Sequence, residues 1–196
     1  MEKSSTISGN KPKILCFSGP NGSGKSTITQ NEEITGLYIN ADEIKKQRVC
    51  SDLDAAGEAE KLREWCLKEK RDFTFETVLS TGRNIRLLER ARKAGYYIKT
   101  IYVLTADPAL NVFRVKSRVA DGGHDVPEEK IRSRYYKSLA NVPNLLNFCD
   151  ECYIIDNTGE PEVIFAKNGS EQVFRENQYW NREKIQRLVE GELYNE

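Results

Sequence analysis

The stretch Gly19-Pro-Asn-Gly-Ser-Gly-Lys-Ser-Thr27 decides the fold, because it satisfies the pattern G-x-x-x-x-G-K-[ST] of a phosphate-binding loop. The preceding residues, 13–18, form a short apolar run that predicts a buried strand, and a helix is expected directly after the loop. Glycines let the backbone wrap so that several N–H groups point at one phosphate, with no Cβ in the way. The nucleotide-binding residues we expect are Gly19, Pro20, Asn21, Gly22, Ser23, Gly24, Lys25, Ser26 and Thr27.

Two side chains of this loop have specific expected roles. Lys25 would contact the β and γ phosphates, and the hydroxyl of Ser26 would coordinate Mg²⁺, which bridges phosphate oxygens. The sequence holds neither the LSGGQ of transporter ATPases nor the guanine-reading N/T-K-x-D. We therefore expect ATP and Mg²⁺ as cofactors, although a phosphate-binding loop alone does not define a reaction.

Strand-like and helix-like segments alternate along the rest of the chain. Apolar runs at 13–18, 37–40, 73–77, 97–104 and 152–156 predict strands, and helical patterns lie between them, for example at 85–95 and 107–118. This alternation predicts an α/β fold, a three-layer sandwich around a five-stranded, mainly parallel sheet.

The C-terminal part has a different pattern. Residues 163–174 hold two apolar pieces around Asn168-Gly169, which predicts a hairpin, and an apolar stripe from Ile185 to Leu193 predicts an amphipathic helix. We expect a disordered tail at 1–10, a core at 11–160 with a lid around 118–134, and the hairpin and helix as an appendage at 161–196.

Composition limits the partners. Thirty Lys and Arg balance thirty Asp and Glu, so we expect neither nucleic acid nor a membrane surface as a partner. No apolar run is long enough to span a bilayer and the first residues are polar, so a cytoplasmic protein is expected. In that compartment the five cysteines should be reduced. Cys149 and Cys152 form a C-x-x-C, for which we favour buried thiols over redox or zinc chemistry.

A second group of polar residues follows the predicted strands. Asp42 comes after the second strand, Glu76 and Thr77 end the third, and Ser80 lies just beyond. The carboxyl ends of parallel strands face one crevice, which here also holds the phosphate-binding loop. Two carboxylates beside an ATP γ-phosphate suit phosphorylation of a hydroxyl: one accepts its proton or holds Mg²⁺, and the other binds the substrate. The alternative is that Asp42 caps a helix and Glu76 is solvated.

Four motifs together resemble the zeta toxin family of P-loop kinases. They are the phosphate-binding loop, INADEI at 39–44, FETVLSTG at 75–82 and RVADGGHDVPEEKIRSRY at 118–135. The resemblance covers residues 13–157. It implies a P-loop kinase-like core and ATP-dependent phosphorylation of UDP-N-acetylglucosamine or a related UDP-amino sugar, which starves cell-wall synthesis, and it makes an antitoxin protein a possible partner.

The resemblance also implies roles for residues. Asp42 matches the family's catalytic base, which we also consider as a metal ligand with Ser26, and Glu76 matches the substrate-binding carboxylate. Arg118 matches the first of two arginines that hold the transferring phosphate. His124 stands where the second is usual, so either protonated His124, Arg132 or Arg134 supplies that charge. For Arg134 a surface ion pair is the alternative.

Other functions remain open from the sequence. The same residue types suit a kinase of another small metabolite, such as a nucleoside or nucleotide. A non-catalytic nucleotide-dependent binding module is a third hypothesis. On the charged helix expected at 52–70, Trp65 either stacks on a base or anchors the helix, and we favour the anchor.

Overall fold

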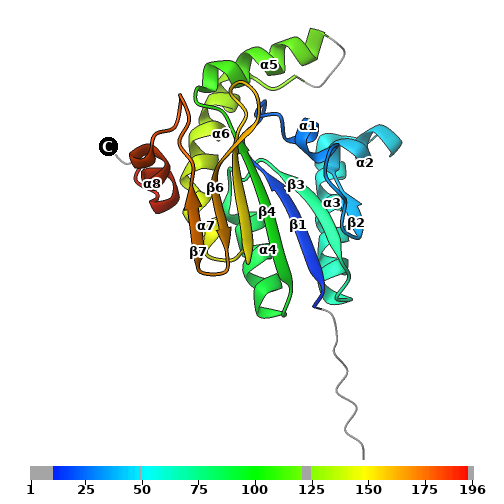
Figure 1. Ribbon diagram of the computed structural model, residues 1–196. Helices are drawn as coiled ribbons and strands as arrows, with labels where there is room; N and C mark the ends of the chain where they lie inside the picture. The colour runs from blue at the N-terminus through cyan, green and yellow to red at the C-terminus, as the bar shows by residue number, and fades with distance from the viewer. Residues whose placement is uncertain (1–10, 49, 121–124, 194–196) are drawn as a thin grey trace, which may run out of the picture.

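A computed structural model describes residues 11–48, 50–120 and 125–193 of the chain. The expected tail at 1–10 and the candidate residue His124 lie outside the described residues. Figure 1 shows the elements, which in chain order are β1 (Lys13–Ser18), α1 (Lys25–Thr29), β2 (Leu37–Ile39), α2 (Ala41–Arg48), α3 (Asp52–Lys68), β3 (Phe73–Thr77), α4 (Gly82–Lys93), β4 (Tyr97–Leu104), α5 (Pro108–Ala120), α6 (Glu128–Ala140), α7 (Val142–Leu146), β5 (Glu151–Asp156), β6 (Glu162–Asn168), β7 (Glu171–Phe174) and α8 (Arg182–Glu190).

One mixed sheet runs through the molecule. Its strand order is β2-β3-β1-β4-β5-β6-β7, and the first five strands are parallel. β1 is the middle one of these five parallel strands, with β3 on one side and β4 on the other. The chain connections between strands therefore lead to opposite sides of the carboxyl end of β1. Open parallel sheets form a ligand-binding crevice at such a point. The α/β class predicted from the sequence is confirmed.

The strand count was predicted wrongly. The sheet has seven strands rather than five, because the hairpin of β6 and β7 continues the sheet instead of forming a separate appendage. β6 pairs antiparallel with β5, which otherwise would be an edge, and it buries Ile164 and Phe165 completely. The predicted turn is correct: Gly169 follows Asn168 with a φ of 57°. The predicted helix is also present as α8, with Ile185 and Leu188 buried.

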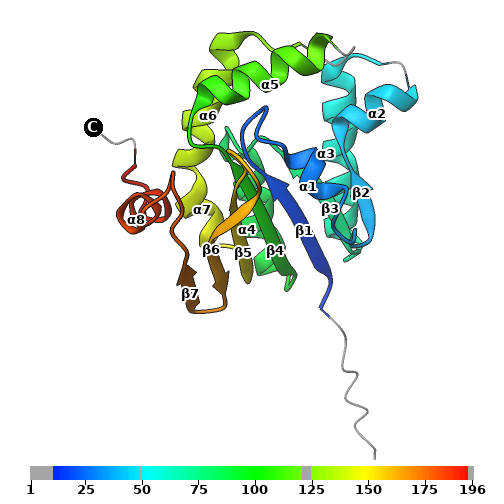
Figure 2. The same cartoon turned by 45° about the horizontal axis from the view of Figure 1, so that its top comes forward.

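Helices cover both faces of the sheet. On one face α3, α4, α7 and α8 enclose the larger core with residues such as Cys16, Phe75 and Leu88. On the other, Ile28 of α1 packs on a smaller cluster that includes Phe17 and Val103. Figure 2 shows α1 on the near side of the strands and α4 on the far side. Among the described residues, no helix has the length and apolarity needed to cross a bilayer.

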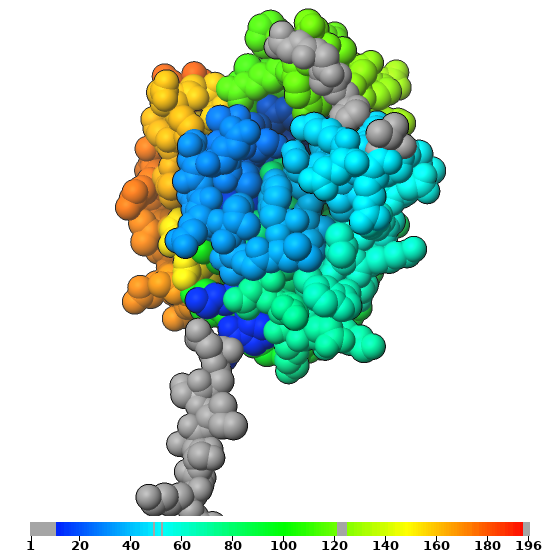
Figure 3. All heavy atoms as spheres, turned by 90° about the vertical axis from the view of Figure 1, so that its right-hand side faces the viewer, coloured from blue at the N-terminus to red at the C-terminus, as the bar shows by residue number. Residues whose placement is uncertain are grey.

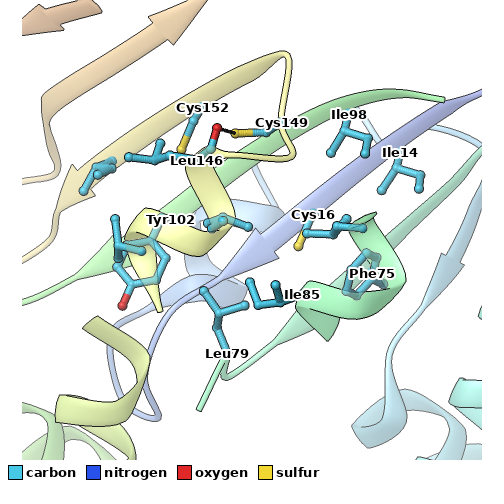
Figure 4. Close-up of a cluster of buried hydrophobic side chains, with 14 of the residues drawn as sticks. Ile14, Cys16, Phe75, Leu79, Ile85, Ile98, Tyr102, Leu146, Cys149 and Cys152 are labelled. Carbon is cyan, nitrogen blue, oxygen red and sulfur yellow. Dashed lines mark hydrogen bonds between the residues drawn. The ribbon is translucent and has the colours of Figure 1, made fainter. Parts of the chain in front are cut away.

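The cysteine pair belongs to the larger core (Figure 4). Cys149 and Cys152 are 2% and 0% exposed and neither is in a disulfide, as predicted. The Cys149 thiol donates to the carbonyl of Leu146 at 3.7 Å. Trp65 is 45% exposed, and the Arg71 guanidinium lies 5.4 Å from its ring centre. The choice between anchoring the helix and stacking on a base stays a prediction.

Candidate active site

The phosphate-binding loop has a backbone that only glycine permits. Gly19 and Gly24 have φ values of 137° and 91°, which side chains rarely adopt. A Cβ on Gly19 would lie 2.0 Å from the carbonyl oxygen of Val103, and one on Gly24 would lie 2.1 Å from Nδ2 of Asn157. The loop is therefore shaped both by backbone conformation and by close contacts with its neighbours.

Two buried amides fasten this loop to the rest of the fold. Asn111 of α5, 0% exposed, donates from Nδ2 to the carbonyl of Asn21 at 2.7 Å. Asn157, directly after β5, donates from Nδ2 to the carbonyl of Ser23 at 2.8 Å. No sequence motif pointed to either residue. A buried amide holding a loop carbonyl fixes the direction of the neighbouring peptide groups, so these contacts preform the loop.

Lys25 opens α1 at the end of the loop. Its Nζ donates to the carbonyls of Gly19 and Pro20 at 2.8 and 3.0 Å. Burial lowers the pKa of Lys25 to about 8, and the carboxylates of Glu76 and Asp42 oppose this shift. The ammonium thus lies folded over the loop, within reach of any anion that the loop holds.

The two carboxylates predicted from the strand ends share a cleft with Lys25. Glu76 accepts from the Ser26 hydroxyl at 3.3 Å and from the Tyr38 hydroxyl at 2.6 Å. Asp42 lies in the first turn of α2, and its backbone N–H donates to Oδ1 of Asn40 at 2.9 Å. Asn40 rather than Asp42 therefore caps this turn, and Glu76 accepts hydrogen bonds from two side chains, while the roles of both carboxylates in a reaction stay predictions.

Two arginines of α5 complete the cleft. Arg114 and Arg118 are one helical turn apart and both line it. Nη2 of Arg114 donates to the carbonyl of Thr158 at 3.4 Å, whereas its Nη1 is buried without a partner in the described residues. Arg118 was predicted from its motif, whereas Arg114 was not, because the residue that Arg114 contacts, Thr158, is remote in the chain.

The cleft has a volume of about 390 Å³. Figure 3 shows the molecule from the side of α1 and α2. The surface is recessed where these two helices meet α5, which lies at the top of the view. Residues from the loop, α2, β3 and α5 line the cleft, among them Lys25, Ser26, Asp42, Glu76, Arg114 and Arg118.

Other predicted site residues have different surroundings. The Thr77 hydroxyl accepts from Nδ2 of Asn84 at 2.7 Å and from the N–H of Leu79 at 3.0 Å, so it fixes the turn after β3. Of the described residues, Ser80 and Arg132 are not among those that line the cleft. Arg132 forms an ion pair with Glu128 at 2.9 Å. Arg134 does reach the loop: its Nη1 donates to Oδ1 of Asn21 at 3.4 Å.

The fold and the phosphate-binding loop together define a P-loop nucleotide-binding protein with a kinase-like fold. A model of the family described as "Zeta toxin" matches residues 1–170. The chain belongs to the zeta toxin family, as its motifs indicated. An uncharacterized protein of Haemophilus influenzae is 31% identical over 129 residues, which is 63% of this chain and 92% of that protein.

Several solved structures have a similar fold. The AvrRxo1-ORF1:AvrRxo1-ORF2 complex with sulphate ions is similar to this chain with a TM-score of 0.70 and 14% identity over 92% of the chain, and the same complex with ATP has a TM-score of 0.70 and 13% identity. The chain spans 64% of the length of that neighbour. The PezAT toxin–antitoxin system of Streptococcus pneumoniae gives a TM-score of 0.59 at 15% identity, over 96% of this chain and 88% of the other.

Proposed function

We propose that the protein is an ATP-dependent kinase that phosphorylates a hydroxyl of UDP-N-acetylglucosamine or a related UDP-amino sugar. The observation that carries the proposal is the single cleft in which Asp42 and Glu76 lie with Lys25, Ser26 and Arg118. A protein that only binds nucleotide needs no pair of carboxylates to receive an acceptor beside the phosphate site. Family membership supports the kinase class and motivates the choice of a UDP-amino sugar.

The residues present fit a magnesium–nucleotide ligand. Magnesium prefers oxygen ligands and is usually held by one or two carboxylates together with phosphates, and the cleft offers the Ser26 hydroxyl and the Asp42 carboxylate. When bound, the ion would neutralise charge on the phosphates. The unpartnered Nη1 of Arg114 and the glycine-lined loop are a cationic, donor-rich surface that an anionic nucleotide would satisfy.

Each side chain then has a task in the transfer. Lys25 turns from the loop carbonyls to the β and γ phosphates, and Arg118 neutralises charge on the transferring group. Asp42 accepts the proton of the attacking hydroxyl, and Glu76 binds the acceptor and orients it. Arg134, which already contacts the loop at Asn21, is the better placed of the described lid candidates for the second arginine. Most of the rate enhancement would come from positioning the two substrates and from electrostatic stabilisation of the transferring phosphate.

The order of the strands suggests how a nucleotide would be oriented in the cleft. The acceptor carboxylates lie on the β2–β3 side of β1, so the γ-phosphate of a bound nucleotide would face that side. The nucleobase would then lie toward the β4–β5 side, where Arg114 and Thr158 could contact it. We assign Arg114 to the nucleotide rather than to the acceptor.

An antitoxin partner is a second part of the proposal. The PezAT neighbour is a toxin–antitoxin system, and the AvrRxo1 neighbour is a two-component complex. A protein that covered the cleft would silence the kinase by excluding ATP or the acceptor.

The test is ADP release from Mg-ATP, with and without UDP-N-acetylglucosamine and a panel of sugars, nucleosides and nucleotides, with Lys25→Ala as the blank. We expect stimulation by the UDP-amino sugar in the wild type and none in the blank. Stimulation by a nucleoside instead would keep the mechanism and replace the substrate. No stimulation by any acceptor would contradict the kinase and favour a nucleotide-dependent binding module.

A further inference from the structure

Tyr38 donates a hydrogen bond to one of the two carboxylates of the cleft, Glu76, and no motif pointed to it. In β2 it pairs with Thr74 of β3, and Glu76 follows two residues later on the same face of the sheet. The Tyr38 side chain can therefore reach diagonally across the strand pair. Its hydroxyl donates to Oε1 of Glu76 at 2.6 Å.

The same hydroxyl is part of a longer polar chain. It accepts from Nδ2 of Asn40 at 3.0 Å, and Oδ1 of Asn40 accepts the backbone N–H of Asp42 at 2.9 Å. One route of hydrogen bonds thus runs from the carboxylate of Glu76 to the helical turn that carries the Asp42 carboxylate. Burial and the hydrogen bond to Glu76 raise the pKa of Tyr38, so the hydroxyl remains a donor at neutral pH.

The contacts of Glu76 are unequal. Its other oxygen, Oε2, has the longer contact, 3.3 Å, with the Ser26 hydroxyl. Ser26 is exposed in the cleft and is the group proposed to turn toward a metal ion when nucleotide binds. Tyr38 then remains the protein donor that holds Glu76, because its contact is short and lies away from the phosphates.

We propose that Tyr38 is a positioning residue for the acceptor: its hydroxyl fixes the Glu76 carboxylate and, through Asn40, the turn that carries Asp42. The proposal rests on the proposed function. It states that one hydroxyl on an edge strand sets the geometry of the acceptor side while leaving the nucleotide side unaffected. A phenylalanine at position 38 would fill the same space and remove only the hydroxyl that bonds to Glu76 and Asn40.

The test compares Tyr38→Phe with a matched control, Tyr97→Phe. Tyr97 also donates its hydroxyl to a glutamate, Glu151, but at the amino ends of β4 and β5, the opposite end of the sheet from the cleft. For both variants we would measure kcat, the KM for the acceptor, the KM for ATP and the midpoint of thermal unfolding.

For Tyr38→Phe we expect the KM for the acceptor to rise about tenfold, as loss of one hydrogen bond to a charged group predicts, with the KM for ATP changed less than about twofold. Tyr97→Phe should leave all three kinetic constants unchanged. Asn40→Ala, which frees the α2 turn, should lower kcat by a factor of about five or more. Thermal unfolding reports whether each variant is folded.

The outcomes separate this proposal from the one it rests on. If the wild type shows no acceptor-stimulated turnover, the proposed function fails and the role of Tyr38 fails with it. If the wild type turns over and Tyr38→Phe has wild-type constants, or loses ATP and acceptor affinity equally, only the positioning role is overturned.

Discussion

The nucleotide side and the acceptor side of the cleft are built differently. On the nucleotide side, buried amides of Asn111 and Asn157 hold the loop, and Ser23 is fully buried. On the acceptor side, α2 has no buried residues and begins after the three-residue edge strand β2. The loop is thus preformed, whereas the acceptor side is held by exposed and partly buried polar contacts and is the half expected to adjust on binding.

The largest effect is expected when the proposed catalytic base, Asp42, is removed from the acceptor side of the cleft. Asp42→Asn should lower kcat by about 10² or more, because the hydroxyl loses its proton acceptor, while the preformed loop still binds ATP. Steady-state kinetics and ATP binding by calorimetry would check both parts.

Glu43→Gln is the matched control for this variant, since Glu43 is the next residue of α2 and forms an exposed contact with Lys46 at 3.4 Å. A wild-type rate for Asp42→Asn would contradict the base assignment. Recovery of the rate at raised Mg²⁺ would assign Asp42 to the metal instead.

The preformed loop is tested by Asn157→Asp. The change replaces the donor that faces the carbonyl of Ser23 with an oxygen, so two acceptors meet across 2.8 Å. We expect a loss of about 1–3 kcal/mol in the free energy of unfolding and a fall in ATP affinity of roughly 10- to 30-fold. Denaturant unfolding and calorimetry measure the two effects, with Asn144→Asp, at an exposed position of α7, as the control. Unchanged ATP affinity would mean that the loop forms only around its ligand.

Arg114→Leu tests whether the β4–β5 side of the cleft binds the nucleotide. Because the guanidinium lies beside Thr158 with one nitrogen unpartnered, its loss should weaken ATP binding about tenfold and leave the KM for the acceptor unchanged. Lys116→Leu, on the same helix but paired with Glu128 at the surface, is the control. A change in the KM for the acceptor alone would move Arg114 to the other half of the cleft.

The smallest effects are expected for two residues that the sequence placed in the substrate site. Ser80 and Arg132 lie away from the cleft lining, so Ser80→Ala and Arg132→Ala should each change kcat/KM by less than about twofold. Kinetics with saturating ATP would show this. A fall of fivefold or more in a stably folded variant would mean that these residues join the site when substrate binds.

The sequence predicted the parts of the site that local signals define. The loop pattern located Lys25 and Ser26, and the rule for carboxyl ends of parallel strands located Asp42 and Glu76 in one crevice. Both inferences depend on short stretches whose backbone is nearly determined by their own residues.

The parts that were missed depend on contacts between distant segments. Asn157 and Ser23 are 134 residues apart, and Asn111 and Asn21 are 90 apart, so neither pair carries a local pattern. The sheet was predicted with too few strands for a similar reason. A hairpin is recognisable from its turn, but nothing in its own residues shows that β6 will pair with β5.

The most direct test of the central claim is phosphorus NMR of the products formed from Mg-ATP and UDP-N-acetylglucosamine, with Asp42→Asn in parallel. Transfer within one shared cleft predicts a new phosphomonoester signal on the sugar nucleotide, appearing together with ADP, and no such signal in the variant over the same period. ADP accompanied only by orthophosphate, or an unchanged mixture, would contradict transfer to this acceptor.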